Sequence, residues 1–249
     1  MKIAICLRRV PDTTAKIAIG PSGVAIDEAG VKFVPNPYDE YALEAGIALK
    51  EAAGAGETVV VSFGGDNVQE TMRTALAMGV DRAVHLQGTP SADGLANARV
   101  LADHLRDGGY DLILFGKVAV DDYGQQTGAM VAELLGRPCA TAITSLVIEG
   151  GTAKVTREVE GGVESAQCSL PAVFTCDKGL NTPRLPGLKG IMSAKKKPLD
   201  VVPTVAGAAQ VTVVSLALPP ERAAGRIVGE GAAAVPALIA ALTNDAKVL

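Results

Sequence analysis

Aromatic residues and long hydrophobic runs are both scarce in this sequence. Aromatic residues make up 3% of its 249 residues and tryptophan is absent, although hydrophobic residues as a whole make up 48%. An interior of alanine, valine, leucine and isoleucine favours packed layers of helices and strands. No run of about 18 apolar residues is present to span a membrane, and the N-terminal segment is too short and strand-like for a signal peptide. We therefore expect a soluble, intracellular protein with no membrane span.

Histidine and cysteine are scarce as well, which argues against several kinds of site. The chain has two histidines and four cysteines without CxxC spacing, so neither a zinc site nor a disulfide framework is indicated, and we expect buried thiols. A net charge of −4 with few aromatics argues against a nucleic-acid surface, which needs a basic face and stacking rings. The phosphate-binding patterns GxGxxG after the first strand and GxxxxGK[ST] are both missing.

Strand-like and helix-like segments alternate over roughly the first three quarters of the chain. Buried strands are predicted at 2–10, 58–65, 82–88 and 110–117, and helices at 36–56, 68–79, 92–109 and from about residue 127. No hairpin signals separate them. This pattern predicts an α/β fold with a mostly parallel sheet, right-handed crossovers and helices on both faces.

The pattern changes in the last part of the chain. Residues 146–170 alternate apolar and polar residues around two Glu-Gly-Gly turns, which predicts a small antiparallel hairpin, and 171–178 returns to a buried strand. Residues 179–198 contain Gly and Pro throughout and predict an extended surface loop. A Pro-rich arm and an Ala-rich helix follow, and such an arm does not easily bury itself alone. We predict an α/β domain at 1–202 and a C-terminal arm at 203–249.

Loop-type residues follow three of the predicted strands, at 6–10, 63–66 and 116–127. Ligands of doubly wound sheets sit at such carboxyl ends. The stretch DDYGQQTG opens a helix, so its backbone N–H groups and polar side chains could hold an anion, although plain helix capping explains these residues equally well. Asp121 and Asp122 have no accompanying base, nucleophile or third ligand in sequence, so no catalytic or metal residue is predicted.

Five segments, in order along the chain, resemble the β subunit of electron transfer flavoprotein. They are NPYDEYALE, ETMRTALAMGVDRAVH, GKVAVDDYGQQTGAM, REVEGGVES with LPAVFT, and LNTPRLPGLKGIMSAKKKP. The resemblance covers residues 1–202 and continues more loosely to the C-terminus. Ala166 and Phe174 stand where the family usually has aliphatic residues, which are mild departures. The fold implied is that of the adenine nucleotide α-hydrolases, in agreement with the alternating pattern.

The resemblance implies a heterodimer whose α subunit supplies most of the binding surface for a redox FAD, while the β subunit buries a structural AMP. The residues that it places around the AMP are Cys6, Asn36, Phe63, Asp121, Asp122, Tyr123, Gly124, Gln125, Gln126 and Thr127. The polar start of the helix would hold the phosphate, and the two aspartates would be structural or directed at the ribose. A second branch of the family binds another FAD there and bifurcates electrons; its loop resembles DGDTAQVGP, and residues 126–130 are closer to the AMP branch.

The resemblance also implies docking of partner flavin dehydrogenases at residues 179–198 and passage of electrons to a downstream acceptor. Leu188 matches the apolar residue that enters the partner, with Ile191 and Met192 beside it. The lysines at 195–197, namely Lys195, Lys196 and Lys197, would frame the site and steer acidic partners, although a short charge run is usually a solvated face.

Two further residues are placed by the resemblance. Glu158 would pair with an arginine of the α subunit, and Thr13 occupies a place near the flavin ring where some relatives have an aromatic residue. We expect an electron carrier without its own turnover, located in the bacterial cytoplasm or the mitochondrial matrix. The alternatives are a bifurcating subunit with a second FAD and a stand-alone ATP-using enzyme or nucleotide sensor, although an SGGxDS loop is absent.

Overall fold

The computed structural model describes residues 1–221 and 224–249, which form two compact units, one of residues 1–215 and one of residues 216–249. The first unit is built on a nine-stranded sheet with the strand order β11-β10-β9-β12-β8-β1-β6-β7-β13. The strands are β1 (Lys2–Cys6), β6 (Glu57–Gly64), β7 (Arg82–Gln87), β8 (Leu112–Gly116), β9 (Cys139–Glu149), β10 (Thr152–Val159), β11 (Gly162–Ser169), β12 (Ala172–Cys176) and β13 (Leu199–Pro203).

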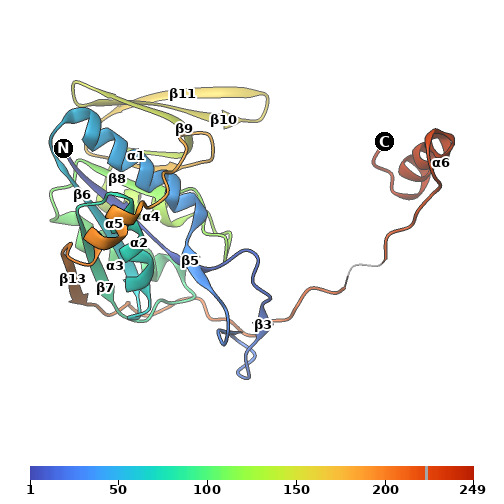
Figure 1. Cartoon of the computed structure of the whole chain (residues 1–249), viewed down its shortest axis with the longest axis horizontal. Coiled ribbons are helices and arrows are strands. Elements are labelled where there is room, and N and C mark those ends of the chain that lie inside the picture. Colours follow the sequence, from blue (N-terminus) through green and yellow to red (C-terminus); the bar gives the residue numbers. More distant parts are fainter. Residues whose placement is uncertain (222–223) are drawn as a thin grey trace. The chain divides into compact units, whose positions relative to one another are not determined.

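Most of this sheet is parallel, as predicted. Every neighbouring pair from β9 to β13 is parallel, while β10 is antiparallel to both β9 and β11. These last strands form the meander at the top of Figure 1. The predicted hairpin is therefore an extension of the main sheet rather than a separate element, and its turns lie at the predicted glycine pairs.

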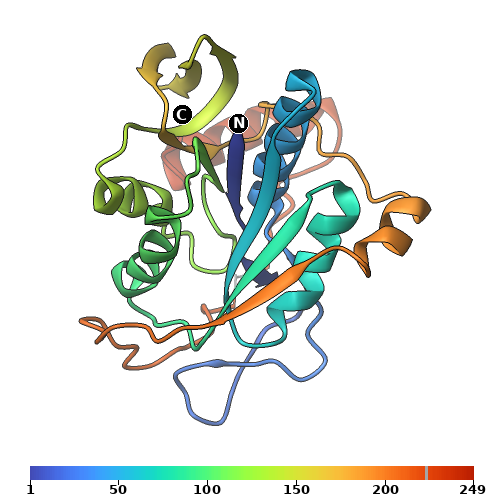
Figure 2. The same cartoon turned by 90° about the vertical axis from the view of Figure 1, so that its left-hand side faces the viewer.

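Helices cover both faces of the sheet (Figure 2). The helices α1 (Pro37–Ala53), α2 (Val68–Met78) and α5 (Leu188–Ala194) lie on one face, and α3 (Gly94–Arg106) and α4 (Thr127–Leu135) lie on the other. Alternate residues of each strand serve the two faces: in β1, Ile3 and Ile5 enter the first core and Ala4 enters the second. Two aliphatic cores thus sandwich the sheet.

Helix α1 contains, within its own residues and the one that follows them, the features that predict where it starts and where it ends. Pro37 stands in its first turn, Asp39 and Glu40 lie at the positive end of its dipole, and Gly54 ends it in the left-handed conformation with φ of 64°. The predicted helix at 36–56 is confirmed apart from its ends.

Several predicted elements differ from the structure. The predicted strand at 2–10 is broken, because the chain leaves the sheet after Cys6 and β2 (Arg9–Pro11) pairs instead with β5 (Phe33–Pro35). A small pair, β3 (Ala18–Ile19) with β4 (Ile26–Asp27), was not predicted. Strand β9 begins at Cys139, ahead of the predicted start at residue 146. The expectation of buried thiols is wrong for Cys139, which is exposed, and Cys168 is half-buried.

The predicted extended loop at 179–198 is also wrong in part, because it contains helix α5 and leads into β13, which was not predicted. Seven residues are too few to show a helical period. The second unit holds η1 (Ala232–Ala234), α6 (Val235–Ala240) and η2 (Ala241–Asp245). Among the described residues, no helix has the length and apolar character needed to cross a bilayer.

Candidate functional site

The main cleft lies where the winding of the sheet reverses. From β1 the chain proceeds to β6 and β7 on one side and then returns to β8 on the other, so the loops after β1 and β8 diverge. The crevice beyond such strand ends is the usual ligand site of doubly wound sheets. Here it is a cleft of about 1150 Å³, slightly above the range of roughly 300–1,000 Å³ typical of small-molecule sites.

The structure brings most of the predicted nucleotide residues together in this cleft. The predicted residues that line it are Cys6, Phe63, Asp121, Asp122, Tyr123, Gly124, Gln125, Gln126 and Thr127, and Thr13 lines it too. Asn36 lies behind the wall, fully buried. Segments from three strand ends thus converge on one hollow, which is the arrangement that the loop pattern of the sequence indicated.

Asn36 organises the loop after β8. Its side-chain nitrogen donates to the Val118 carbonyl oxygen at 2.9 Å, and its side-chain oxygen accepts from the Val120 N–H at 3.2 Å. The same nitrogen donates to Asp39 Oδ1 at 3.0 Å. Because both ends of the amide are used in this way, Asn36 shapes the cleft from behind.

Asp39 is a buried carboxyl group beside the cleft. It accepts the Arg8 N–H at 2.7 Å and the Gly116 N–H at 3.0 Å, so it joins the ends of β1 and β8. Burial raises the pKa of Asp39 to about 7, although these N–H donors and the Arg8 charge oppose the shift. Burial also raises the pKa of the Cys6 thiol well above its ordinary value, so Cys6 contributes a neutral wall.

Asp121 and Asp122 share one arginine. Arg8 Nη2 lies 2.8 Å from Asp121 Oδ2, and Arg8 Nη1 lies 2.6 Å from Asp122 Oδ2. The other oxygen of Asp122 accepts the Gly124 N–H at 2.8 Å. Burial raises the pKa of Asp121, and the Arg8 charge opposes this shift. Both carboxylates therefore pair with Arg8, and Asp122 also accepts a backbone hydrogen bond from the turn. Within the described residues, no side chain caps the start of α4.

The start of α4 is consequently open to the cleft. Its first residues, Thr127 and Gly128, line the cleft, whereas α3 is capped by Asp93, which accepts the Leu95 N–H at 2.9 Å. The unpaired N–H groups of a first helical turn attract anions. Gly128 lets α4 approach the sheet, because a Cβ there would lie 2.5 Å from Thr175 Cγ2.

The turn that leads into α4 is held in an uncommon backbone conformation. Tyr123 and Gln125 have φ of 50° and 56°, in the left-handed region that side chains other than glycine rarely adopt. Such residues concentrate at ligand sites, where the surrounding structure maintains the strain. Their position at the cleft agrees with a binding role for this turn.

Sequence reasoning missed several cleft residues. Arg8 resembles an ordinary solvent charge, and Asp39 resembles a helix N-terminal acid; only the fold places them at the switch point. Arg9 lines the cleft with its guanidinium 3.4 Å from the centre of the Phe33 ring. The segment after β13 reaches the same rim, where the Gln210 N–H donates to Asp93 Oδ2 at 2.7 Å.

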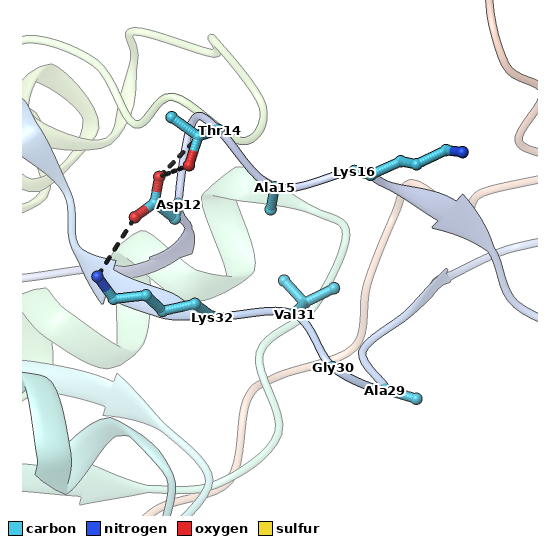
Figure 3. A pocket seen from close by; sticks show the side chains of 8 residues that line it. All are labelled: Asp12, Thr14, Ala15, Lys16, Ala29, Gly30, Val31 and Lys32. Carbon is cyan, nitrogen blue, oxygen red and sulfur yellow. Dashed lines mark hydrogen bonds and ion pairs between the residues drawn. The ribbon is translucent and has the colours of Figure 1, made fainter.

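A smaller hollow of about 240 Å³ lies along the loop between β2 and β5 (Figure 3). Asp12 turns toward its own loop, accepting from the Thr14 N–H and hydroxyl at 2.9 and 2.7 Å, and pairs with Lys32 at 3.6 Å. These contacts close the loop. Among the residues that the structure describes, no three His, Cys, Asp or Glu side chains gather in a way that could hold a metal ion.

The predicted docking residues form an exposed surface around α5. We define the docking surface as Leu188, Ile191, Met192, Lys195 and Lys196. The apolar side chains are 76%, 49% and 67% exposed respectively. Lys195 and Lys196 are exposed, but the prediction that Lys197 frames the site is wrong, because its ammonium group donates to the Leu76 and Val80 carbonyl oxygens.

The loop before α5 is anchored to α1. Arg184 binds Glu44 and Glu51, with nitrogen-to-oxygen distances of 2.7 Å to each. Asn181 donates to the Tyr41 carbonyl oxygen at 2.9 Å. Glu158 lies apart from this surface, exposed on β10 opposite Val163, and makes no ion pair with any described residue.

Comparison with known proteins places the chain in a family. Residues 23–207 match the family described as Electron transfer flavoprotein domain. The chain is 42% identical over 225 residues to the electron transfer flavoprotein subunit beta of Syntrophomonas wolfei, covering 90% of this chain and 88% of that one. It is 39% identical to the subunit beta of Bradyrhizobium diazoefficiens over the full length of both chains. The human subunit beta is 40% identical, covering 90% of this chain and 91% of the relative. The chain therefore belongs to the electron transfer flavoprotein family, as an electron carrier of the subunit beta type rather than an enzyme.

Proposed function

We propose that this chain pairs with an α subunit, holds AMP in its own cleft, and presents the docking surface to flavin dehydrogenases, so that electrons pass through a shared FAD to a downstream acceptor. The observation that carries the nucleotide part is the open N-terminus of α4 at the switch-point cleft. The proposed location is the cytoplasm of a bacterium or the mitochondrial matrix of a eukaryote.

The residues present suit a nucleoside monophosphate. The first turn of α4 offers backbone N–H groups for a phosphate, and Arg8 compensates the two aspartates that would otherwise repel it. Cys6 and Phe63 supply apolar walls on the same cleft for a base. Asn36 acts from behind, by holding the loop after β8 in place.

FAD, when bound mainly by the α subunit, supplies reversible electron acceptance, and this chain would contribute contacts around it. Glu158 is exposed on β10 and available to an arginine of that subunit. The unit 216–249 exposes apolar side chains, among them Val235, Leu238 and Ile239, as expected of an arm that packs on a partner. Both features support a heterodimer.

The docking surface suits an acidic partner with an apolar pocket. Three exposed apolar side chains lie on α5, and the exposed Lys195 and Lys196 directly follow this helix. An apolar anchor supplies affinity in small interfaces, and surrounding charge supplies association rate. Flavin dehydrogenases are the proposed partners of this surface.

The decisive experiment is to purify the chain with its α subunit, denature the complex, and count the released nucleotides by chromatography and absorbance. One FAD and one AMP per heterodimer are expected. ATP without flavin would overturn the proposal and favour a stand-alone nucleotide protein.

A second candidate is a bifurcating subunit with its own redox FAD. The observation in its favour is that the cleft of about 1150 Å³ has room for a ligand larger than a mononucleotide. The same count decides between the two, since this candidate requires two FAD molecules and no AMP.

A further inference from the structure

Helices α2 and α5 are joined by reciprocal contacts at their C-terminal ends. A cation that follows α5 binds the end of α2, and a cation of α2 binds the end of α5. Lys197 Nζ donates to the carbonyl oxygens of Leu76 at 2.9 Å and Val80 at 2.6 Å, at the C-terminal end of α2. Arg73 Nη1, from within α2, donates to the carbonyl oxygens of Ala194 at 2.7 Å and Lys197 at 2.8 Å, at the end of α5. Carbonyl groups at helix C-termini are left without intrahelical donors and carry partial negative charge, so both contacts are favourable.

The backbones of the two helices also touch. A Cβ added at Gly190 would lie 2.2 Å from the Ala77 carbonyl oxygen, so only glycine permits this approach. Together with the reciprocal cation contacts, this fixes α5 in both distance and direction relative to α2.

Helix α5 cannot maintain this position by itself. It has seven residues and, within the described chain, no side-chain N-cap, and helices of that length are unstable in isolation. Of its seven described residues, Ala194 alone is buried, so apolar burial holds it only weakly. Its larger apolar side chains, Leu188, Ile191 and Met192, point outward into the docking surface.

We infer that Arg73 and Lys197 are positioning residues that hold α5 in a docking-competent orientation, so that a partner dehydrogenase meets a preordered surface. If α5 is already ordered before binding, association does not include the entropic cost of ordering it. The partner therefore binds more tightly. The inference rests on the proposed docking function. It also assigns different roles to the three lysines at 195–197. Lys197 binds carbonyl oxygens of this chain, and only Lys195 and Lys196 contact the partner.

The test uses the intact heterodimer and a purified flavin dehydrogenase of the source organism, chosen because it reduces the unaltered heterodimer in a dye-coupled assay. Lys197→Met removes the inward ammonium group, and Lys196→Met removes an outward one as a matched control. For Lys197→Met we expect the KM for the heterodimer to rise at least about tenfold with kcat unchanged, and the rise to persist in high salt. For Lys196→Met we expect a smaller rise that disappears in high salt.

Two further variants make the role specific. Lys197→Arg keeps a cation that can reach carbonyl oxygens, so its KM should lie close to that of the unaltered heterodimer. Arg73→Met should raise the KM as Lys197→Met does. Hydrogen exchange of the α5 amides should be faster in Lys197→Met and in Arg73→Met than in Lys196→Met. Unchanged exchange in both inward variants would overturn the inference.

Leu188→Ala, measured in parallel, separates this inference from the docking proposal. If Leu188→Ala raises KM and Lys197→Met does not, the positioning role is wrong and the docking surface stands. If Leu188→Ala leaves KM unchanged, the docking proposal itself is wrong, whatever the exchange data show.

Discussion

Asp39 Oδ1 accepts a hydrogen bond from the Gly116 N–H at 3.0 Å, so the first turn of α1 holds the end of β8. The other oxygen holds the Arg8 N–H, just beyond β1. One buried carboxylate thus spans the two strands between which the winding of the sheet reverses. A Cβ at Gly116 would lie 2.4 Å from Asp39 Oδ1, so glycine is required for this contact. The shape of the cleft depends on this pair.

Asp39 should make stability fall as pH rises. Its pKa is about 7 in the folded chain against an ordinary value of 3.8, so between these values the folded state holds the proton more tightly than the unfolded state. The stabilisation is complete below the lower pKa and is lost as pH rises through the higher one. Within that window each pH unit removes at most about 1.4 kcal/mol from the free energy of unfolding.

The check is urea unfolding of the heterodimer and of its Asp39→Asn variant across roughly pH 5 to 8. The variant cannot titrate at this position. The urea concentration at the unfolding midpoint of the unaltered protein should therefore fall relative to that of the variant as pH rises. A difference that is independent of pH would show that Asp39 is ionised throughout.

Gly128→Ala should weaken nucleotide binding. The added methyl group would lie 2.5 Å from Thr175 Cγ2 and 3.4 Å from the Phe115 ring, so α4 must move away from the sheet. Such overpacking costs about 1–3 kcal/mol, and it displaces the helix end proposed to hold the phosphate. The AMP retained by the heterodimer after dialysis should fall while its FAD content stays constant.

Gly162→Ala is the matched control, because a Cβ there meets no atom within 4 Å. It should retain AMP like the unaltered protein. Full retention of AMP by Gly128→Ala as well would show that the phosphate lies away from α4.

Local sequence patterns predicted most of the helices and strands. The elements that they did not predict are those that depend on tertiary contacts. Helix α1 carries its own start, stop and dipole signals, and β6 carries a run of three valines, so each was recognisable from a short window. Helix α5 is defined by contacts with α2, which is more than a hundred residues away in sequence, and Lys197 resembles any lysine in a solvated run.

The cleft shows the same division. The three loops at strand ends were predicted from their residues, because parallel strands deliver their carboxyl ends to one edge. The pairing of Arg8 with Asp121 and Asp122 was not, since which charge meets which depends on the strand order. Whether a side chain of this turn caps α4 was likewise not predictable from sequence; Gln126 at the N-cap position makes no side-chain cap hydrogen bond.

Arg8→Met should weaken nucleotide binding without unfolding the protein. The Arg8 side chain is 45% exposed, so its ion pairs contribute only about 0–1 kcal/mol to stability. Its loss leaves two carboxylates uncompensated at a cleft proposed to hold a phosphate, and we expect roughly tenfold weaker AMP binding at low salt. The effect should shrink as salt is added.

Calorimetric titration of AMP into the nucleotide-stripped heterodimer measures this change. Adding Asp121→Asn and Asp122→Asn to Arg8→Met should restore much of the affinity, because the repulsive charges are then gone. If the triple variant binds no better than Arg8→Met, Arg8 contacts the nucleotide directly instead of neutralising the aspartates.

Leu188→Ala should weaken dehydrogenase docking and leave stability unchanged. The side chain is 76% exposed, so its truncation removes little from the folded core, whereas an apolar anchor buried in an interface typically contributes about 2 kcal/mol or more. We expect the KM for the heterodimer to rise at least about tenfold with little salt dependence, because the lost contact is apolar. Val147→Ala, which truncates a side chain 46% exposed on β9, is the control and should keep the original KM. An equal rise in both variants would place docking on a broader face that includes the meander, because no single anchor would then dominate the interface.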